Sequence, residues 1–200
     1  MEDSSQIRFG FRFKKFLAAL QYVASRRELS TLEVSKVLFY ADKHHLTRYG
    51  RPVTGDAYVA MLNGPVPSSA YDWLKNAAKA SRQGLRMAGD ANLHRLLQAV
   101  EVRPERTYAF FSAARFEMED WLSDSDREAL ERGLKECQGL SVGQLIDKSH
   151  KEEAWKKADQ NGRMDLRLLF DLDDPEQRNL LELLCEDQEA EDYLDGITDA

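Results

Sequence analysis

The side chains with the clearest chemical potential cluster around residue 42. Tyr40, Asp42, His44 and His45 follow one another closely. A histidine acts as a general base when a neighbouring group orients its ring, so His45 with Asp42 could carry acid–base chemistry. Adjacent helical side chains point about 100° apart, however, so the two histidines do not face one site. The alternative interpretation is that they pack or lie exposed at the end of a helix, where an imidazolium favours the helix dipole.

The remaining reactive residues give weaker signals. Ser149 directly precedes His150, but a catalytic Ser–His pair requires geometry rather than adjacency in sequence. We therefore interpret Ser149 as a helix cap. Cys137 lies on the apolar face of a predicted helix, and Cys185 stands among acidic residues, which raise the pKa of a thiol. The sequence predicts no catalytic residue, no metal site and no cofactor.

Composition predicts a folded domain with an uneven charge. The chain has 200 residues, 42% of them hydrophobic and 32% charged, with a net charge of −7. Such an acidic chain is a poor candidate for direct nucleic-acid binding, although the basic segment Arg8–Lys15, rich in phenylalanine, leaves that alternative open. No apolar run is long enough for a bilayer and the start does not resemble a signal peptide, so we expect a cytoplasmic protein without membrane contact.

The acidic residues concentrate at the C-terminal end. Residues 165–200 hold 13 acids and 2 bases, a net charge of −11, whereas residues 1–164 carry +4. We expect a domain over 1–164 and an acidic extension over 165–200 that is helical and packs on the same domain. Two interpretations of the extension remain open: a solvated terminal helix, or an acidic arm that contacts a basic partner or a basic groove on its own body.

Hydrophobic periodicity places these residues on helices. Apolar residues at helical spacing predict helices over 12–26 and 31–48, the second capped by Ser30 with Glu33 and stopped near Gly50. Residues 51–68 predict a short extended segment ending in the turn at 63–65. A helix follows Ser68, residues 80–91 form a loop, and two short strands form a hairpin about residues 104–106.

The second half reads as a series of short helices. Helical structure is expected again from about residue 112, with capping boxes at Ser125/Glu128, Ser141/Gln144 and Ser149/Glu152. Residues 164–172 predict a strand or a short helix, and Asp174-Pro175 begins a last helix. The expected fold is mainly α with a small β element (α+β), a compact helical domain with a short strand or hairpin insertion.

Three stretches together resemble a known family. They are residues 37–56, which include Tyr-Ala-Asp at 40–42; residues 58–72, which include Gly-Pro-Val-Pro at 64–67; and the Leu-Ser elements at 122–126 and 140–141 with Ser-His-Lys-Glu-Glu-Ala-Trp at 149–155. Over about residues 12–160 the sequence resembles the Panacea domain, the SocA-like antitoxin family of bacterial and phage toxin–antitoxin systems.

The resemblance implies a function in protein binding. A family member neutralises a cognate protein toxin, encoded by a neighbouring gene, through direct protein–protein binding. One branch of the family instead delivers its toxin to an AAA+ protease as an adapter, which is the first alternative. An uncharacterised enzyme that uses the region of Tyr40, Asp42 and His45 is the second.

The resemblance also indicates candidate site residues. Aromatic residues and arginine dominate protein interfaces, and carboxylates near turns cap backbone or meet a basic partner. The predicted partner-binding residues are Tyr40, Asp42, His45, Tyr49, Arg51, Asp56, Tyr58 and Tyr71. The residues predicted to shape the motif itself are Gly55, Gly64, Pro65, Pro67, Ser149, His150 and Trp155.

Overall fold

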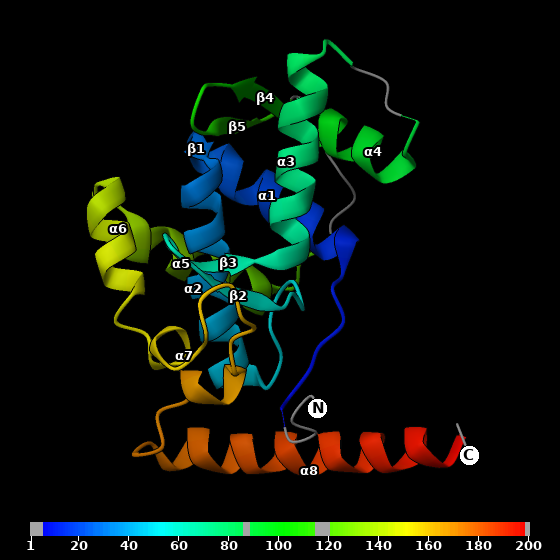
Figure 1. The fold of residues 1–200 in the computed structure, drawn as a ribbon, viewed down its shortest axis with the longest axis vertical. Coiled ribbons are helices and arrows are strands. Elements are labelled where there is room, and N and C mark those ends of the chain that lie inside the picture. The colour runs from blue at the N-terminus through cyan, green and yellow to red at the C-terminus, as the bar shows by residue number, and fades with distance from the viewer. Residues whose placement is uncertain (1–5, 86–88, 115–120, 199–200) are drawn as a thin grey trace.

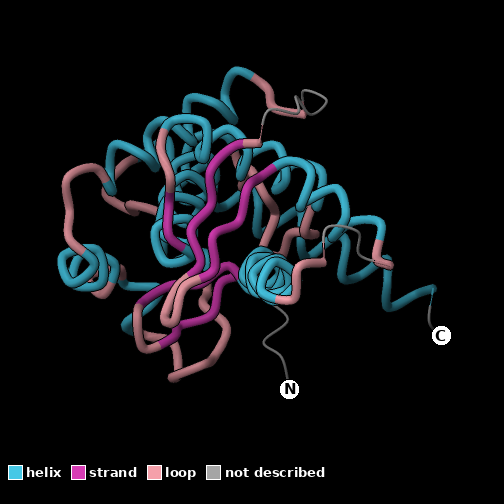
Figure 2. The backbone as a smooth tube through the Cα atoms, turned by 90° about the horizontal axis from the view of Figure 1, so that it is seen from above, coloured by secondary structure: helices cyan, strands magenta, loops and turns pink. Residues whose placement is uncertain are grey.

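A computed structural model describes residues 6–85, 89–114 and 121–198. In this part of the chain, helices form most of the fold and are joined by two small antiparallel sheets (Figures 1 and 2). The structure therefore confirms the prediction of a mainly α fold with a small β element. None of the helices in the described ranges is long and apolar enough to span a membrane.

The second helix is the centre of the domain. Helix α2 (Thr31–Tyr49) packs against α1 (Phe13–Arg26) and, most extensively, against α5 (Asp124–Cys137). Ser30 and Glu33 form the predicted capping box at its start, and Gly50 ends it in the left-handed conformation. Because neighbouring elements cover most of its surface, polar side chains of α2 such as Lys36 and Asp42 become buried along with its apolar ones.

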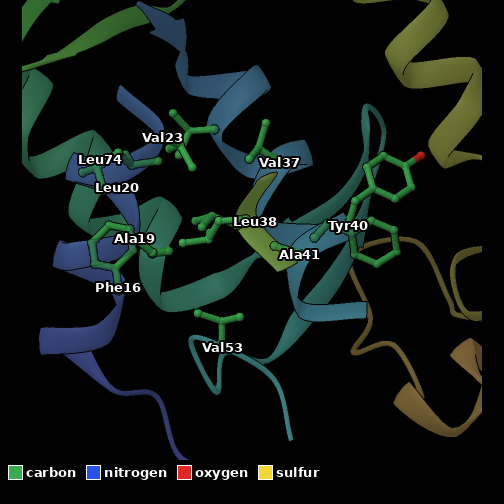
Figure 3. Close-up of a cluster of buried hydrophobic side chains, with 14 of the residues drawn as sticks. Phe16, Ala19, Leu20, Val23, Val37, Leu38, Tyr40, Ala41, Val53 and Leu74 are labelled. Carbon is green, nitrogen blue, oxygen red and sulfur yellow. The ribbon is translucent and has the colours of Figure 1, made fainter. Parts of the chain in front are cut away.

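A hydrophobic cluster joins three of the helices. Figure 3 shows Phe16 and Leu20 of α1 near Leu38 of α2 and Leu74 of α3 (Ser68–Arg82). All four side chains are fully buried. The ring of Tyr40 points away from this cluster toward α6 (Val142–Ser149) (Figure 3). One face of helix α2 is therefore apolar and packs against α1 and α3. Another face, which includes Tyr40, is partly polar and is turned toward α6.

The strands form one three-stranded sheet and one hairpin. Strands β1 (Leu29–Ser30), β5 (Ala109–Ala113) and β4 (Val100–Pro104) pair in that order. The predicted hairpin near Pro104 is confirmed, but α4 (Ala91–Ala99) precedes it. Strands β2 (Tyr58–Met61) and β3 (Gly64–Pro67) form the second hairpin. The extended segment predicted before the turn at 63–65 is therefore only its first strand, since Gly64-Pro65 already belong to the second.

Two predicted capping boxes are wrong. At α5 the cap is Ser123, whose hydroxyl accepts a hydrogen bond from the Asp126 amide, so the box begins two residues before the predicted Ser125. Ser149 is the last residue of α6 and donates its hydroxyl proton to the Ile146 carbonyl, 3.0 Å away. The next helix, α7 (Glu153–Lys156), begins after Glu152 without a side-chain cap. The third box, Ser141 with Gln144, is confirmed.

Other boundaries differ more modestly. Residues 112–113 belong to β5, and residues 115–120 lie outside the described residues, so the helix expected from residue 112 is seen only as α5. Residues 164–172 contain a 3-10 helix, η1 (Leu166–Leu169). Helix α8 (Pro175–Thr198) begins as predicted, with the Asp174 carboxylate accepting from the Glu176 amide at 2.9 Å.

The acidic last helix crosses one end of the domain. Figure 1 shows α8 below the other elements, with its C-terminal end reaching past them. Its first half packs Leu180 and Leu184 near Gly50, and further along Asp192 pairs with Arg8. The helix therefore contacts one base of its own body, whereas a contact of the acidic arm with a basic partner stays a prediction. The domain boundary at residue 164 also stays a prediction.

Candidate functional site

Asp42 is the acceptor at the centre of a buried polar cluster. Its carboxylate accepts hydrogen bonds from the Thr54 amide (2.9 Å), the Thr54 hydroxyl and the Tyr58 hydroxyl (2.9 Å). Burial raises the pKa of Asp42 to about 6 even though these hydrogen bonds act in the opposite direction. The cluster ties α2 to the loop before β2, and these hydrogen bonds direct Asp42 toward Thr54 and Tyr58 and not toward His45.

Asp56 caps a helix from a distance. Its two carboxylate oxygens accept hydrogen bonds from the amides of Ser69 (3.0 Å) and Ala70 (2.7 Å) in the first turn of α3. Pro67, the residue that immediately precedes the helix, provides no side-chain cap. Because the first amides of a helix have no intrahelical acceptor, Asp56 supplies what the local sequence lacks. It thereby fixes the direction in which α3 leaves the β2–β3 hairpin.

His45 lies beside Ser125 and Asp126 rather than beside Asp42. Its Nδ1–H donates to the Arg51 carbonyl (2.6 Å), and its Nε2 lies 3.1 Å from the Ser125 hydroxyl and 3.4 Å from Asp126. Burial lowers the pKa of His45, so the neutral ring accepts the proton of Ser125. The structure therefore does not bring Asp42 and His45 together as the acid–base pair of the alternative interpretation, because different segments of the chain surround the two side chains.

Asp126 collects several positive charges. Its carboxylate contacts Lys15 and lies 3.2 Å from Arg51, and it also accepts the Ser123 amide at 2.8 Å. Burial alone would raise the pKa of Asp126, but the hydrogen bonds from Lys15 and Ser123 lower it to about 2. The cluster joins α1, α2 and α5 at one point.

The low pKa of Asp126 predicts an acid-dependent loss of stability. A carboxyl group whose pKa is lowered by folding stabilises the fold fully above about pH 4, and this contribution is lost as the pH falls toward 2. Between pH 6 and pH 2.5 the free energy of unfolding should fall by about 1–2 kcal/mol more in the wild type than in Asp126→Asn. Urea unfolding at both pH values measures the difference, and parallel losses in the two proteins would contradict it.

The β2–β3 hairpin is clamped by the third motif stretch. His150 Nε2 donates to the Leu62 carbonyl and Trp155 Nε1 to the Met61 carbonyl, each at 3.1 Å. The two rings stack on each other with centroids 3.8 Å apart. Two motifs that are separated by about 90 residues in the sequence thus meet at the tip of one hairpin.

Gly64 is required where the hairpin meets this clamp. Its φ is +90°, a conformation that favours glycine. A Cβ at this position would lie 2.2 Å from Ser149 Oγ and 2.5 Å from Lys36 Nζ. Because Gly64 has no side chain, Ser149 and Lys36 can lie directly against the hairpin backbone.

A pocket of about 520 Å³ opens beside the hairpin. We call the surface around it the hairpin face: Met61, Leu62 and Asn63 of the hairpin, Tyr71, Lys75, Lys79 and Arg82 of α3, and Arg106, Thr107 and Tyr108 of the β4–β5 turn. Lys36 and Leu32 of α2 also line the pocket. Residues distant in the sequence therefore form one surface of mixed apolar and basic character.

Lys36 is the most unusual residue of the pocket. It is 1% exposed, and its ammonium group donates to the Pro65 carbonyl at 3.1 Å. Burial lowers its pKa to about 7. Lys36 carries no motif in the sequence, although one signal is present. It precedes Tyr40 by four residues on the same helix face, so one face of α2 combines a charge with an aromatic ring.

The predicted partner-binding residues divide into three places. Asp42, His45, Asp56 and Tyr58 are buried at 3% exposure or less. In this conformation they do not reach the surface, and we infer that they position it. Tyr71 lies on the hairpin face. Tyr49 and Arg51 lie at the other end of α2, where Tyr49 donates to Glu128 (3.0 Å). Their role in partner binding stays a prediction.

Tyr40 and the cysteines complete the inventory of reactive groups. Tyr40 is 6% exposed, and its hydroxyl has no hydrogen-bond partner among the described residues, while Lys148 lies 5.0 Å above its ring. Burial raises the pKa of Tyr40, and it raises the pKa of the Cys137 thiol to about 12. Burial is also the main cause of the raised pKa of Cys185. None of these groups is activated as a nucleophile.

Gly55, Pro65 and Pro67 lie in the segments that connect these clusters. At Gly55 the Gly10 carbonyl passes so close that a Cβ would be 2.2 Å from its oxygen. Pro65 pairs with Ala60 and Pro67 with Tyr58 across the hairpin. The contributions of these residues to the motif are therefore close backbone approach and strand pairing.

Comparison with known proteins identifies one family. The model of the family described as "Antitoxin SocA-like, Panacea domain" matches residues 34–156, which is more than half of the chain. No curated protein and no solved structure matches the chain. The matched range includes the Asp42 cluster, the hairpin, the clamp formed by His150 and Trp155, and the hairpin face.

Proposed function

The chain belongs to the SocA-like Panacea antitoxin family, and we propose that it neutralises a protein toxin by binding the toxin directly. A toxin partner follows from the family name, whereas the binding mode and the surface are our proposal. The observation that carries it is the hairpin face, because the other two motif stretches both hold the hairpin in place. Asp42 of the first stretch binds Tyr58, and His150 and Trp155 of the third bind the hairpin tip.

The hairpin face has the composition of a binding surface. Leu62 is 73% exposed at the tip of a hairpin whose backbone is fixed by His150 and Trp155. Single exposed apolar residues are common, but here Tyr71, Tyr108, Arg82 and Arg106 surround the same pocket. Tyrosine and arginine are the types enriched at energetic centres of protein interfaces, and a rigid surface loses less entropy on binding.

The opposite end of α2 is less suited to bind a partner. Glu128 already receives the Tyr49 hydroxyl and lies near Arg48 (3.6 Å), while Arg51 pairs with Asp126. A partner there would have to replace these internal contacts. We therefore place the toxin on the hairpin face and not around Tyr49.

Exchange of Leu62 tests this placement. We expect Leu62→Ser to weaken the complex with the product of the adjacent gene at least tenfold, because truncation of a residue at the energetic centre of an interface costs about 2 kcal/mol or more and tenfold corresponds to about 1.4 kcal/mol. Leu172→Ser is the matched control, since Leu172 is 55% exposed but lies in the loop before α8. Isothermal titration measures both affinities, and thermal melting confirms that both variants fold. Equal affinities of Leu62→Ser and the wild type would refute the hairpin face as the toxin site.

The same pair of variants separates neutralisation from adapter activity. In cells that co-express the two proteins, direct neutralisation rescues growth while the toxin level on an immunoblot stays constant. An adapter to an AAA+ protease would rescue growth with a falling toxin level. Leu62→Ser should abolish the rescue in either case. The immunoblot therefore distinguishes the two mechanisms, and the variant tests whether the toxin binds the hairpin face.

A further inference from the structure

The pocket of the hairpin face has an unbalanced charge. Besides Lys36, four basic side chains line it: Lys75, Lys79, Arg82 and Arg106. None of its lining residues in the described ranges is acidic. Lys75 pairs with Asp72 at 2.8 Å on the outer side of α3, and Arg82 donates to the Glu105 carbonyl. Within the part of the chain that the structure describes, the side chains of Lys79 and Arg106 have no ion-pair or hydrogen-bond partner.

A second hollow of the same size shows that this imbalance is specific. It also measures about 520 Å³ and is lined by Arg48, Arg132 and Lys135, but Glu128 and Glu131 lie among them. In this second hollow bases and acids are thus mixed, as is usual on the surface of a folded protein in water. The hairpin pocket differs because several bases and no acid are among its lining residues in the described ranges.

Lys36 adds a buried positive charge to the wall of the pocket. An ammonium group in a low-dielectric site is costly unless it is paired. Lys36 has one neutral acceptor, the Pro65 carbonyl, and three protons to donate. It is 99% withdrawn from solvent, with an exposure of 1%. The residue therefore keeps unused donor capacity in a wall of the pocket.

Besides the polar Thr31, Ser35, Asn63 and Thr107, the pocket has an apolar and aromatic part. Leu32, Met61, Val66, Ala78 and the rings of Tyr71 and Tyr108 form it. A volume of this size falls within the range of about 300–1,000 Å³ that is typical of small-molecule sites, which are mostly apolar with few fixed polar groups. The chemistry that matches these walls is an anionic group attached to an apolar or aromatic body.

We propose that this pocket is a binding site for a small organic anion, a phosphate or carboxylate carried on an apolar or aromatic body. Lys36, Lys79 and Arg106 hold the anionic group, and Tyr71 and Tyr108 contact the body. The site is distinct from neutralisation itself, since it requires no toxin. Because it opens on the hairpin face, an occupied pocket changes the surface that is offered to the toxin.

Ligand titration of the free protein tests the site. The probes are adenosine monophosphate, phenyl phosphate and benzoate, with adenosine and inorganic phosphate as fragments. We expect at least one of the three organic anions to bind and to raise the melting temperature, and each fragment to bind at least tenfold more weakly. Binding by inorganic phosphate as strong as that of all three would overturn the contribution of the body, and no binding by any of the three would overturn the site.

Two double variants locate the binding. Lys79→Gln/Arg106→Gln should lower the affinity at least tenfold, whereas Arg132→Gln/Lys135→Gln, which removes two charges from the second hollow, should leave it within twofold. Equal losses would show that net charge and not the pocket attracts the anion. If none of the probes binds but Lys79→Gln/Arg106→Gln weakens the toxin complex, the small-molecule site is overturned and the bases belong to the toxin interface. The proposed function stands in that case, so the two failures are distinguishable.

Discussion

Replacing Lys36 with methionine is expected to raise the free energy of unfolding at pH 7 by about 2–4 kcal/mol. Burial lowers the pKa of Lys36 from 10.5 to about 7, and this change corresponds to roughly 5 kcal/mol at about 1.4 kcal/mol per pKa unit. Methionine fills a similar volume without a charge. It leaves the Pro65 carbonyl without its hydrogen bond, which costs about 1–3 kcal/mol and reduces the gain.

The pH dependence identifies the cause of this gain. A base whose pKa is lowered by folding binds more protons in the unfolded chain, so stability rises as the pH increases from about 7 toward 10.5. The wild type should therefore gain stability between pH 7 and pH 9, and Lys36→Met should lack this part of the rise. Urea unfolding at pH 7, 8 and 9 measures both curves.

A matched lysine provides the control. Lys79 lines the same pocket but is exposed, so Lys79→Met should change stability by no more than about 0.5 kcal/mol. A Lys36→Met protein that is less stable than the wild type at pH 7 would contradict the argument. The more stable variant should also bind the anionic probes more weakly, since a stabilising loss of a buried charge is the pattern expected of a residue kept for function.

Gly133→Ala is expected to cost at least about 3 kcal/mol of stability, the largest loss that we predict for a single added methyl group. A Cβ on Gly133 would lie 2.3 Å from the Val37 carbonyl oxygen and 3.1 Å from the Ala41 amide nitrogen. Both are backbone atoms of α2 and cannot rotate away. Helices α2 and α5 would have to separate, and this interface holds His45 beside Asp126.

A second helical glycine gives the opposite expectation. Gly143 lies in α6, and a Cβ there meets nothing within 4 Å. Gly143→Ala should therefore stabilise the protein by about 0.5–1 kcal/mol through helix propensity. Thermal and urea unfolding of the two variants test the prediction. Similar effects of both substitutions would mean that α5 can shift on α2 at little cost, contrary to the close packing seen here.

The two variants also separate stability from function in cells. Gly133→Ala should lower the amount of folded protein and, with it, the rescue of growth, because a loss of this size moves much of the chain to the unfolded state. Gly143→Ala should leave rescue unchanged. Purified Gly133→Ala at low temperature should still bind the toxin if the hairpin face remains folded, which is the expected result for a residue without toxin contact.

Local sequence signals determined most of the helices and several of their ends. The apolar spacing of α1, the Ser30–Glu33 box and Gly50 act within a few residues, so the structure and the prediction agree there. The family resemblance also came from the sequence, because its motifs are short contiguous stretches. Ser123 and Ser125 could each cap α5 by the capping-box pattern, so the pattern alone did not identify the cap. In the folded chain Ser123 is the cap and Ser125 contacts His45.

Only the tertiary structure decided which polar residues share a site. Asp42 and His45 are close in the sequence, but their surroundings differ. Thr54 and Tyr58 donate to Asp42, whereas His45 lies near Asp126. Lys36 was not recognised as a site residue, because its burial depends on the hairpin, Ser149 and the β4–β5 turn, which lie far from it in the sequence. A side chain's pKa and partners depend on the elements packed over it. The residue pattern of α2 does not predict which distant segment covers each of its faces.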